Sequence, residues 1–190
     1  MIKPVDILIV GVGGQGTVLA SKILAQVGLE IGVDVKVSEI HGMAQRGGSV
    51  VTQVRFGKEV HSPIIKKGGA DIILAFEKLE ALRWLDYLSG DGQIIVNDQQ
   101  IDPMPVIMGA VQYPQDILNT INNSAANTLV IDALSLAKDA GNIKTANVVL
   151  LGILARQLDI PKEVWLKALE NIVPAKFFEV NKNAFELGYK

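Results

Sequence analysis

Two kinds of hydrophobic pattern alternate along the first 140 residues of the chain. Short, nearly unbroken apolar runs are typical of strands that are buried on both faces, whereas apolar residues recurring every three or four positions are typical of helices with one buried face. Runs of the first kind cover 5–10, 33–38, 50–56, 72–76, 93–96 and 128–131, and helical spacing covers 17–31, 77–88, 115–121 and 132–140. This alternation predicts an α/β fold, a Rossmann-like mostly parallel sheet with helices on both faces.

Two other stretches add to this picture. In residues 50–56 apolar positions alternate with Gln53 and Arg55, which predicts a strand with one wetter face. Residues 101–108 are expected to be extended, because Pro103 and Pro105 interrupt them.

The C-terminal part of the chain is expected to be helical. Residues 147–158 are apolar nearly all round, which predicts a helix buried against another element or another subunit. Further helices are expected at 162–171, after Pro161, and at 176–187. We therefore predict a single domain, with an α/β core over residues 1–140 and a helical C-terminal extension over 141–190.

The first apolar run ends in a glycine-rich turn, DILIVGVGGQG over residues 6–16. Gly11, Gly13 and Gly16 have the G-x-G-x-x-G spacing that lets a backbone approach a phosphate at the N-terminus of a helix. The same glycines are also an easy way to join a buried strand to a helix. The sequence leaves both interpretations open for the turn, which also contains Gly14 and Gln15.

A second glycine-rich segment, IHGMAQRGGS, covers residues 40–49 and holds one arginine, Arg46. Beside Gly47, Gly48 and Ser49, its guanidinium could hold a phosphate or a carboxylate, or could bind carbonyls of its own loop. We favour a ligand or interface contact, because loops carry function more often than cores do. His41, at the start of this segment, is a weaker candidate.

The two histidines and one acid are weaker candidates for a site. His41 and His61 are the only histidines, and they are too far apart in the sequence to suggest a metal motif or a catalytic triad, so we expect structural roles. Glu39 falls where a dinucleotide-binding fold keeps the acid that holds a ribose hydroxyl, although a solvated carboxylate is the favoured interpretation.

Composition excludes several classes of function. The chain has no cysteine, which excludes disulfides, thiolate metal sites and cysteine-ligated iron–sulfur clusters and agrees with a reducing cytoplasm. A net charge of -2 gives no reason to expect nucleic acid or a membrane as a partner. No apolar run reaches the length of a membrane span, so a cytoplasmic protein is expected. No catalytic set and no metal site can be assembled from the sequence.

Three segments together resemble a known family: GVGGQG, then SEIHGMAQRGGSVVTQVRFG, then SPIIKKGGADIILAFE. They are similar to gamma-type subunits of 2-oxoacid:ferredoxin oxidoreductases, and HGMAQRGG looks most like the small beta subunit of indolepyruvate ferredoxin oxidoreductases. The C-terminal segments NVVLLGILARQLDIP and FFEVNKNAFELGY also resemble the C-terminal part of these subunits. The resemblance therefore covers nearly the whole chain.

The resemblance implies a subunit of an enzyme that oxidatively decarboxylates arylpyruvates, chiefly indolepyruvate, to aryl-acetyl-CoA and reduces ferredoxin. Thiamine diphosphate and iron–sulfur clusters would lie on a large partner subunit, and this chain would be inactive alone. Carried over by residue, Gly13–Gly16 and His41–Ser49, with Arg46 central, would bind coenzyme A or face the thiamine site.

Other functions remain open at this stage. The chain could be the gamma subunit of a pyruvate or 2-oxoglutarate ferredoxin oxidoreductase. It could be a stand-alone NAD-dependent dehydrogenase that uses Glu39 for the ribose, or an interaction module in which the glycines only make a turn.

Overall fold

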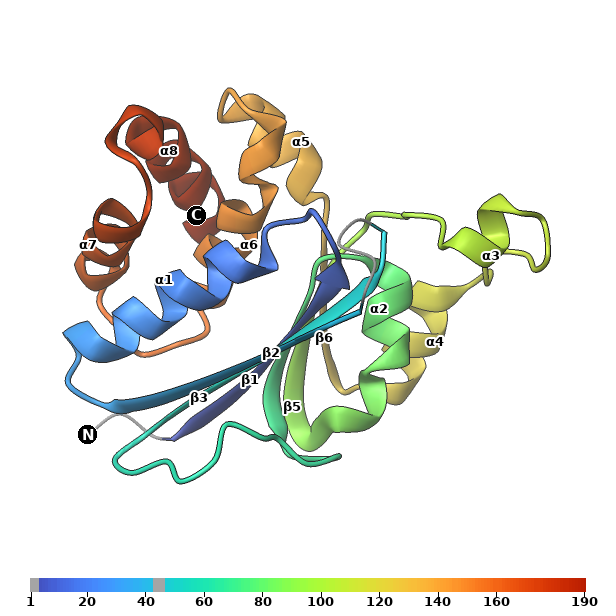
Figure 1. Cartoon of the computed structure of the whole chain (residues 1–190), viewed down its shortest axis with the longest axis horizontal. Helices are drawn as coiled ribbons and strands as arrows, with labels where there is room; N and C mark the ends of the chain where they lie inside the picture. The colour runs from blue at the N-terminus through green and yellow to red at the C-terminus, as the bar shows by residue number, and fades with distance from the viewer. Residues whose placement is uncertain (1–3, 43–46) are drawn as a thin grey trace.

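In the computed structural model, which describes residues 4–42 and 47–190, six strands form one sheet in the order β2-β3-β1-β4-β5-β6 (Figure 1). β1, β4, β5 and β6 pair in parallel, and β3 is antiparallel to both of its neighbours, β1 and β2. The α/β prediction with a mostly parallel sheet is therefore confirmed, with one strand reversed. The strands are β1 (Val5–Val12), β2 (Asp34–His41), β3 (Ser49–Gly57), β4 (Ala70–Ala75), β5 (Leu88–Asn97) and β6 (Asn127–Ile131).

Helices cover both faces of the sheet, as expected (Figure 1). One face carries α1 (Thr17–Glu30), α5 (Ala133–Asp139), α6 (Ala146–Ala155), α7 (Lys162–Ile172) and α8 (Phe178–Tyr189). The other carries α2 (Lys78–Arg83) and α4 (Ile117–Ser124). Short 3₁₀ turns follow at Leu85–Tyr87, Ile143–Thr145 and Ala175–Phe177. Among the described residues, no helix is both long and apolar enough to cross a membrane.

β1 explains why the core has two halves. Successive side chains of a strand point to opposite faces, so Ile7 and Ile9 pack under α1 and α6 while Leu8 and Val10 pack under α2 and α4. All four side chains are fully buried. The absence of polar alternation in this run therefore reflects a strand covered on both sides.

α6 is the most buried helix of the C-terminal part. Every residue from Asn147 to Ala155 is buried, against α8, α5, α1 and β5 of the same chain. Gly152 and Gly188 lie where α6 crosses α8, and a Cβ on Gly188 would collide with the carbonyl of Val149. The two helix backbones thus touch directly, and no second subunit is needed to bury α6.

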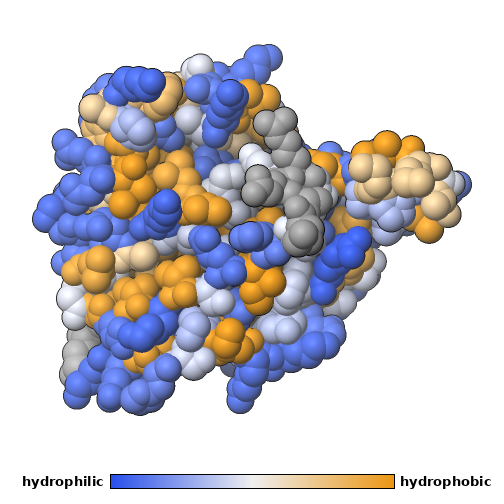
Figure 2. All heavy atoms as spheres, in the orientation of Figure 1, coloured by the Kyte–Doolittle hydropathy of each residue, from blue (hydrophilic) through white to orange (hydrophobic). Residues whose placement is uncertain are grey.

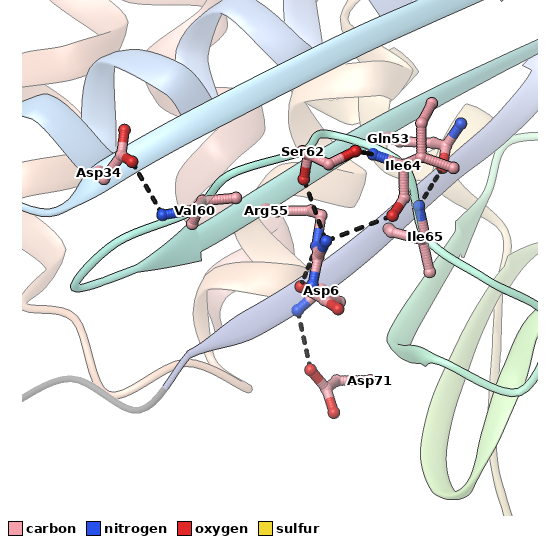
Figure 3. A network of polar contacts seen from close by, with 9 residues as sticks. All are labelled: Asp6, Asp34, Gln53, Arg55, Val60, Ser62, Ile64, Ile65 and Asp71. Carbon is pink, nitrogen blue, oxygen red and sulfur yellow. Dashed lines mark hydrogen bonds and ion pairs between the residues drawn. The ribbon is translucent and has the colours of Figure 1, made fainter.

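A polar network anchors the long connection from β3 to β4 at the N-terminal end of β1 (Figure 3). Arg55 of β3 pairs with Asp6 of β1 at 2.8 Å and also donates to the carbonyls of Ser62 and Ile64. The backbone N–H of Asp6 donates to Asp71 at 2.8 Å. This end of the sheet is held by cross-strand ion pairing and carbonyl contacts, so Arg55 has a structural role.

Two local expectations were wrong. Residues 101–108 are not fully extended, because Met104–Ile107 form one helical turn, α3, whose first positions tolerate proline. The face of β3 that carries Gln53 and Arg55 is much less exposed than expected: Arg55 is half-buried, and Gln53 is only 5% exposed and accepts a hydrogen bond from the backbone N–H of Ile65, which satisfies its side-chain oxygen in the core.

The α6–α8 crossing gives a stability prediction. Gly188→Ala should lower the free energy of unfolding by roughly 2–3 kcal/mol, because the added methyl forces two packed backbones apart. Chemical denaturation would measure the loss. Gly90→Ala is the matched control: Gly90 is exposed with open space around it, and a change within about 0.5 kcal/mol is expected. Equal effects of the two substitutions would contradict this packing.

Candidate functional site

The reversed direction of β3 brings the two glycine-rich segments together. Because β3 is antiparallel to β1, its first residue Ser49 pairs with Val12, the last residue of β1. The N–H of Gly13 then donates to the carbonyl of Gly48 at 2.8 Å, and the N–H of Gly47 donates to the carbonyl of Gly13 at 3.4 Å. Gly13 and Gly47, which are 34 positions apart in the sequence, therefore meet in one backbone junction at the C-terminal end of β1.

The turn after β1 needs its glycines for measurable reasons. Gly14 and Gly16 have φ angles of +103° and +84°, a region that other residues rarely adopt. A Cβ on Gly16 would also lie 2.5 Å from the Asn147 side chain of α6. Gly16 is the N-cap of α1 and offers no side-chain cap, so the first N–H groups of this helix remain available at the turn.

Gln15 ties three strand ends together. Its Oε1 accepts from the N–H of Val12 at 2.7 Å, and its Nε2 donates to the carbonyl of Phe76 at 2.8 Å and to Oε1 of Gln99 at 2.9 Å. These partners belong to the ends of β1, β4 and β5. Gly11 leaves room for this arrangement, because a Cβ there would meet Gln15 Oε1 at 2.9 Å.

Asn97 continues this amide network. Its Nδ2 donates to the carbonyl of Phe76 at 3.1 Å and to Gln99 Oε1 at 3.2 Å, and its Oδ1 accepts from the N–H of Ala133 at 3.1 Å. The last contact ties the end of β5 to the first residue of α5. The ends of four neighbouring elements are thus held by neutral amides.

A cavity of about 690 Å³ opens beside this network. The chain from β1 crosses through α1 toward β2, whereas the chain from β4 crosses through α2 toward β5 on the other side. Such a change of direction leaves a crevice at the C-terminal ends of the strands, where α/β sheets bind ligands. The walls are Gly13, Gly14, Gln15, Gly16, Phe76, Asn97, Gln99, Ile101, Leu134, Ile143, Lys144, Ala146, Asn147 and Leu150.

The charge on the cavity walls is positive. Lys144 is the charged residue among those lining it, and none of them is a carboxylate. The N-termini of α1 and α6 both reach the cavity, through Gly16 and Ala146, and add partial positive charge. An anionic ligand such as a phosphate would therefore meet favourable electrostatics here.

The structure places the predicted site residues in different surroundings. Gly13–Gly16 line the cavity, whereas Gly11 packs beneath the turn and Gly47 and Gly48 bind its backbone. His41 lies at the end of the edge strand β2, exposed and paired in register with Val50. Arg46 lies outside the described residues, and its role stays a prediction. His61 is exposed in the β3–β4 connection, 3.7 Å from Glu59.

Ser49 points to a different partner, a buried acid of α2. Its hydroxyl donates to Glu80 Oε2 at 2.5 Å, and Arg83 approaches the other carboxylate oxygen at 3.3 Å. Glu80 is only 5% exposed, and this burial raises the pKa of its carboxyl above the ordinary value. The nearby Glu77 carboxylate raises it further, while Ser49 and Arg83 act in the opposite direction.

Glu39 does not occupy a ribose-binding position. In a dinucleotide fold the strand that carries this acid lies next to the first strand, whereas here β3 separates β2 from β1. Glu39 accepts a hydrogen bond from the Ser21 hydroxyl of α1 at 2.6 Å and is not part of the cavity wall. Through this hydrogen bond Glu39 connects the edge strand β2 to α1.

Sequence reasoning missed part of the cavity wall. Lys144 and Asn147 come from the start of α6, far along the chain from the glycine turn. Asn147 is a single polar residue at the start of an apolar helix, and this irregularity was a usable signal. Gln99 lies two residues after the end of β5, in a region where ligand-binding side chains often lie. Among residues 4–42 and 47–190, no group of three acids or histidines could hold a metal ion.

The Gln15 clamp gives a second prediction. Gln15→Ala removes the acceptor of the buried Val12 N–H and should cost about 1–3 kcal/mol of unfolding free energy. Hydrogen exchange should also show faster exchange of the Val12 amide. Gln26→Ala is the control, since Gln26 only bonds Glu30 within α1, and it should change stability by less than about 0.5 kcal/mol. An unchanged Val12 amide in the Gln15 variant would refute the clamp.

The raised pKa of Glu80 gives a prediction about pH. Below the ordinary carboxyl pKa of 4.5, Glu80 is protonated in both folded and unfolded chains and burial costs little. As pH rises above 4.5, the unfolded chain ionises first, so this group makes the folded state progressively less stable until its own raised pKa is passed. Glu80→Gln lacks this effect.

Urea unfolding of both proteins from pH 4 to pH 8 should therefore show the stability of Glu80→Gln rising relative to the wild type as pH increases. Other titrating groups are shared by both proteins and cancel in the difference. A difference that is constant with pH, or that falls, would show that Glu80 has an unperturbed or lowered pKa.

Sequence comparison finds relatives of this chain over nearly its whole length. The family model described as pyruvate ferredoxin/flavodoxin oxidoreductase matches residues 6–190. A relative from Thermococcus kodakarensis, indolepyruvate oxidoreductase subunit IorB, is 43% identical over 193 aligned residues, which cover 99% of this chain and 96% of the relative.

Solved structures show the same fold. The gamma subunit of a keto/oxoacid ferredoxin oxidoreductase from Geobacter sulfurreducens has a TM-score of 0.73 at 25% identity, covering 97% of this chain and 96% of that one. A 2-oxoglutarate:ferredoxin oxidoreductase from Magnetococcus marinus, with 2-oxoglutarate, coenzyme A and succinyl-CoA bound, has a TM-score of 0.71 at 19% identity; the match covers 99% of this chain but 31% of that longer one. With a family match over nearly its whole length and a relative above 40% identity, this chain belongs to the pyruvate ferredoxin/flavodoxin oxidoreductase family.

Proposed function

We propose that this chain is the small subunit of a thiamine diphosphate-dependent indolepyruvate ferredoxin oxidoreductase. The complex would convert arylpyruvates to aryl-acetyl-CoA and carbon dioxide and pass the electrons to ferredoxin. The role of this chain would be to bind coenzyme A and to help shape a site shared with a larger subunit. The full-length similarity to a subunit of that name, at 43% identity, supports the choice of substrate class.

The observation that carries the proposal is the carboxylate-free cavity at the glycine turn. Coenzyme A contains an ADP-like diphosphate, and the free N–H groups at the start of α1 are suitable donors to it. Lys144 adds a positive charge at the same cavity. A volume of about 690 Å³ lies within the range usual for small-molecule sites, so the walls fit part of such a carrier in size and charge.

The remaining chemistry would belong to the partner subunit. The chain has no cysteine, so cysteine-ligated iron–sulfur clusters must be held elsewhere in the complex. Thiamine diphosphate, when bound to the partner, would supply the carbanion chemistry of decarboxylation. The residues of this chain would bind the carrier, orient it toward that site and exclude water from one side of it.

A stand-alone NAD-dependent dehydrogenase is a weaker explanation. It needs an acid on the strand beside β1, and Glu39 lies on an edge strand beyond β3, bonded to Ser21. Calorimetry of the isolated chain against NAD and coenzyme A would separate the two. NAD binding at the glycine turn would favour the dehydrogenase, and we expect none.

The proposal is tested by reconstitution. The chain should be purified alone and together with the large subunit of the same oxidoreductase, and ferredoxin reduction assayed with indolepyruvate and coenzyme A. Activity is expected only from the mixture, and indolepyruvate should be a better substrate than pyruvate or 2-oxoglutarate. Full activity of the large subunit alone would refute a required role for this chain, and preference for another 2-oxoacid would refute the substrate assignment.

Variants locate the coenzyme A contact within the same assay. Arg46→Ala and Lys144→Ala should each raise the KM for coenzyme A by about tenfold, as expected when one charge-assisted contact is lost, with little change in the KM for indolepyruvate. Arg156→Ala is the matched control, because Arg156 follows the opposite end of α6 from the cavity. If Arg46→Ala unfolds the protein, the arginine is structural instead.

A further inference from the structure

One part of the chain stands apart from the body of the molecule. Residues 102–112, including α3, form a projection beyond the layers of helices and sheet (Figure 1). Figure 2 shows hydrophobic residues over much of this projection. Met104, Ile107, Met108 and Val111 are 64%, 66%, 75% and 55% exposed. A rigid surface that keeps several large apolar side chains in water is typical of an interaction site.

The projection is firmly mounted. Both of its ends are held by one carboxylate oxygen, Glu77 Oε1, which accepts from the backbone N–H of Ile101 at 3.3 Å and from the hydroxyl of Tyr113 at 2.6 Å. Glu77 itself is 1% exposed and caps α2. The tip is closed by backbone bonds, among them Met108 N–H to Met104 O at 2.9 Å and Ala110 N–H to Pro105 O at 2.9 Å. A partner would therefore find the apolar side chains already in place.

The chemistry of the projection indicates what kind of surface could cover it. Asp102, at the base of the projection, is its one charged residue, and residues 103–112, PMPVIMGAVQ, contain none. A partner has no ion pair to make with these residues, so its own contact surface should be apolar and uncharged as well. The shape is convex, which requires a groove on the partner.

A second copy of this chain is a poor occupant. In a two-fold dimer the same patch contacts itself, and two convex helical turns would bury far fewer than the roughly 20–30 residues per side of a standard interface. Insertion into another part of a second copy closes a two-fold dimer only if both projections insert reciprocally, and it otherwise builds rings or filaments. A different subunit with a groove accommodates the convex shape and needs neither contact between two tips nor a reciprocal exchange of projections.

We infer that residues 102–112 dock into an apolar, uncharged groove on the neighbouring subunit of the oxidoreductase. This inference rests on the proposed role of the chain as one subunit of such a complex. Ile101, where the projection joins the body, also lines the cavity at the glycine turn. Docking at this point would place the neighbouring subunit beside the cavity, where the proposed shared site requires it.

The test is assembly of the two subunits in solution. The double variant Ile107→Ser, Met108→Ser should weaken binding to the large subunit by about 100-fold, because two large apolar side chains lose their burial. The control, Leu29→Ser with Ile64→Ser, changes two similarly exposed apolar residues elsewhere, 65% and 55% exposed, and should bind like the wild type. Both variants should keep the melting temperature of the isolated wild-type chain, because all four side chains are exposed.

Each outcome bears on the inference. Wild-type affinity of the projection variant, or an equal loss in the control, overturns it. Hydrogen exchange of the wild-type chain provides a measurement that does not depend on a variant folding: amides of 102–112 should be protected in the complex, and unchanged exchange overturns the inference. A wild-type dimer of this chain alone that the projection variant abolishes would assign the surface to a second copy and also overturn it. If the wild-type subunits do not bind one another, the proposed function itself fails.

Discussion

The reversed strand β3 is the constraint on which the candidate site depends. Its antiparallel pairing with β1 places Ser49 opposite Val12. The end of the second glycine-rich segment therefore lies beside the start of the first glycine turn. If β3 ran parallel to β1, the same residues would lie at the other end of the sheet, roughly 27 Å away for nine residues at the usual strand rise. The placement of β3 between β1 and β2 also separates these two strands, and this removes Glu39 from a position next to the turn.

The site is assembled with neutral amides on one side and a buried acid on the other. Gln15, Asn97 and Gln99 join the strand ends without charge, and no carboxylate is found among the described residues that line the cavity they border. Glu80 holds the start of β3 through Ser49 without being part of the cavity wall. This separation keeps negative charge out of the cavity while satisfying the polar groups of the junction, which is what binding of an anionic carrier requires.

Local sequence patterns predicted one part of the cavity wall, the glycine turn, but not the residues that reach the cavity from distant segments. Gly13–Gly16 line the cavity, and the sequence pointed to them because glycine spacing after a strand is a local property; that they bind a ligand stays a prediction. Lys144 and Asn147 reach the same cavity from more than a hundred residues away, and nothing in the spacing of the glycines points to them. The helical turn at 104–107 was missed because proline both interrupts helices and begins them, and only the surrounding contacts decide between these roles.

By itself the sequence determined the order and type of most elements, the α/β class, and the glycine turn that leads from the first strand into a helix. It could do so because hydrophobic periodicity and backbone freedom act over a few neighbouring residues. It also determined that no cysteine-bound redox centre can reside on this chain. Only the tertiary structure decided that β3 lies between β1 and β2, that α6 is buried within the chain, and that residues 102–112 project from the body. These outcomes depend on contacts between segments distant in the sequence, whose summed packing and hydrogen bonding no local pattern contains.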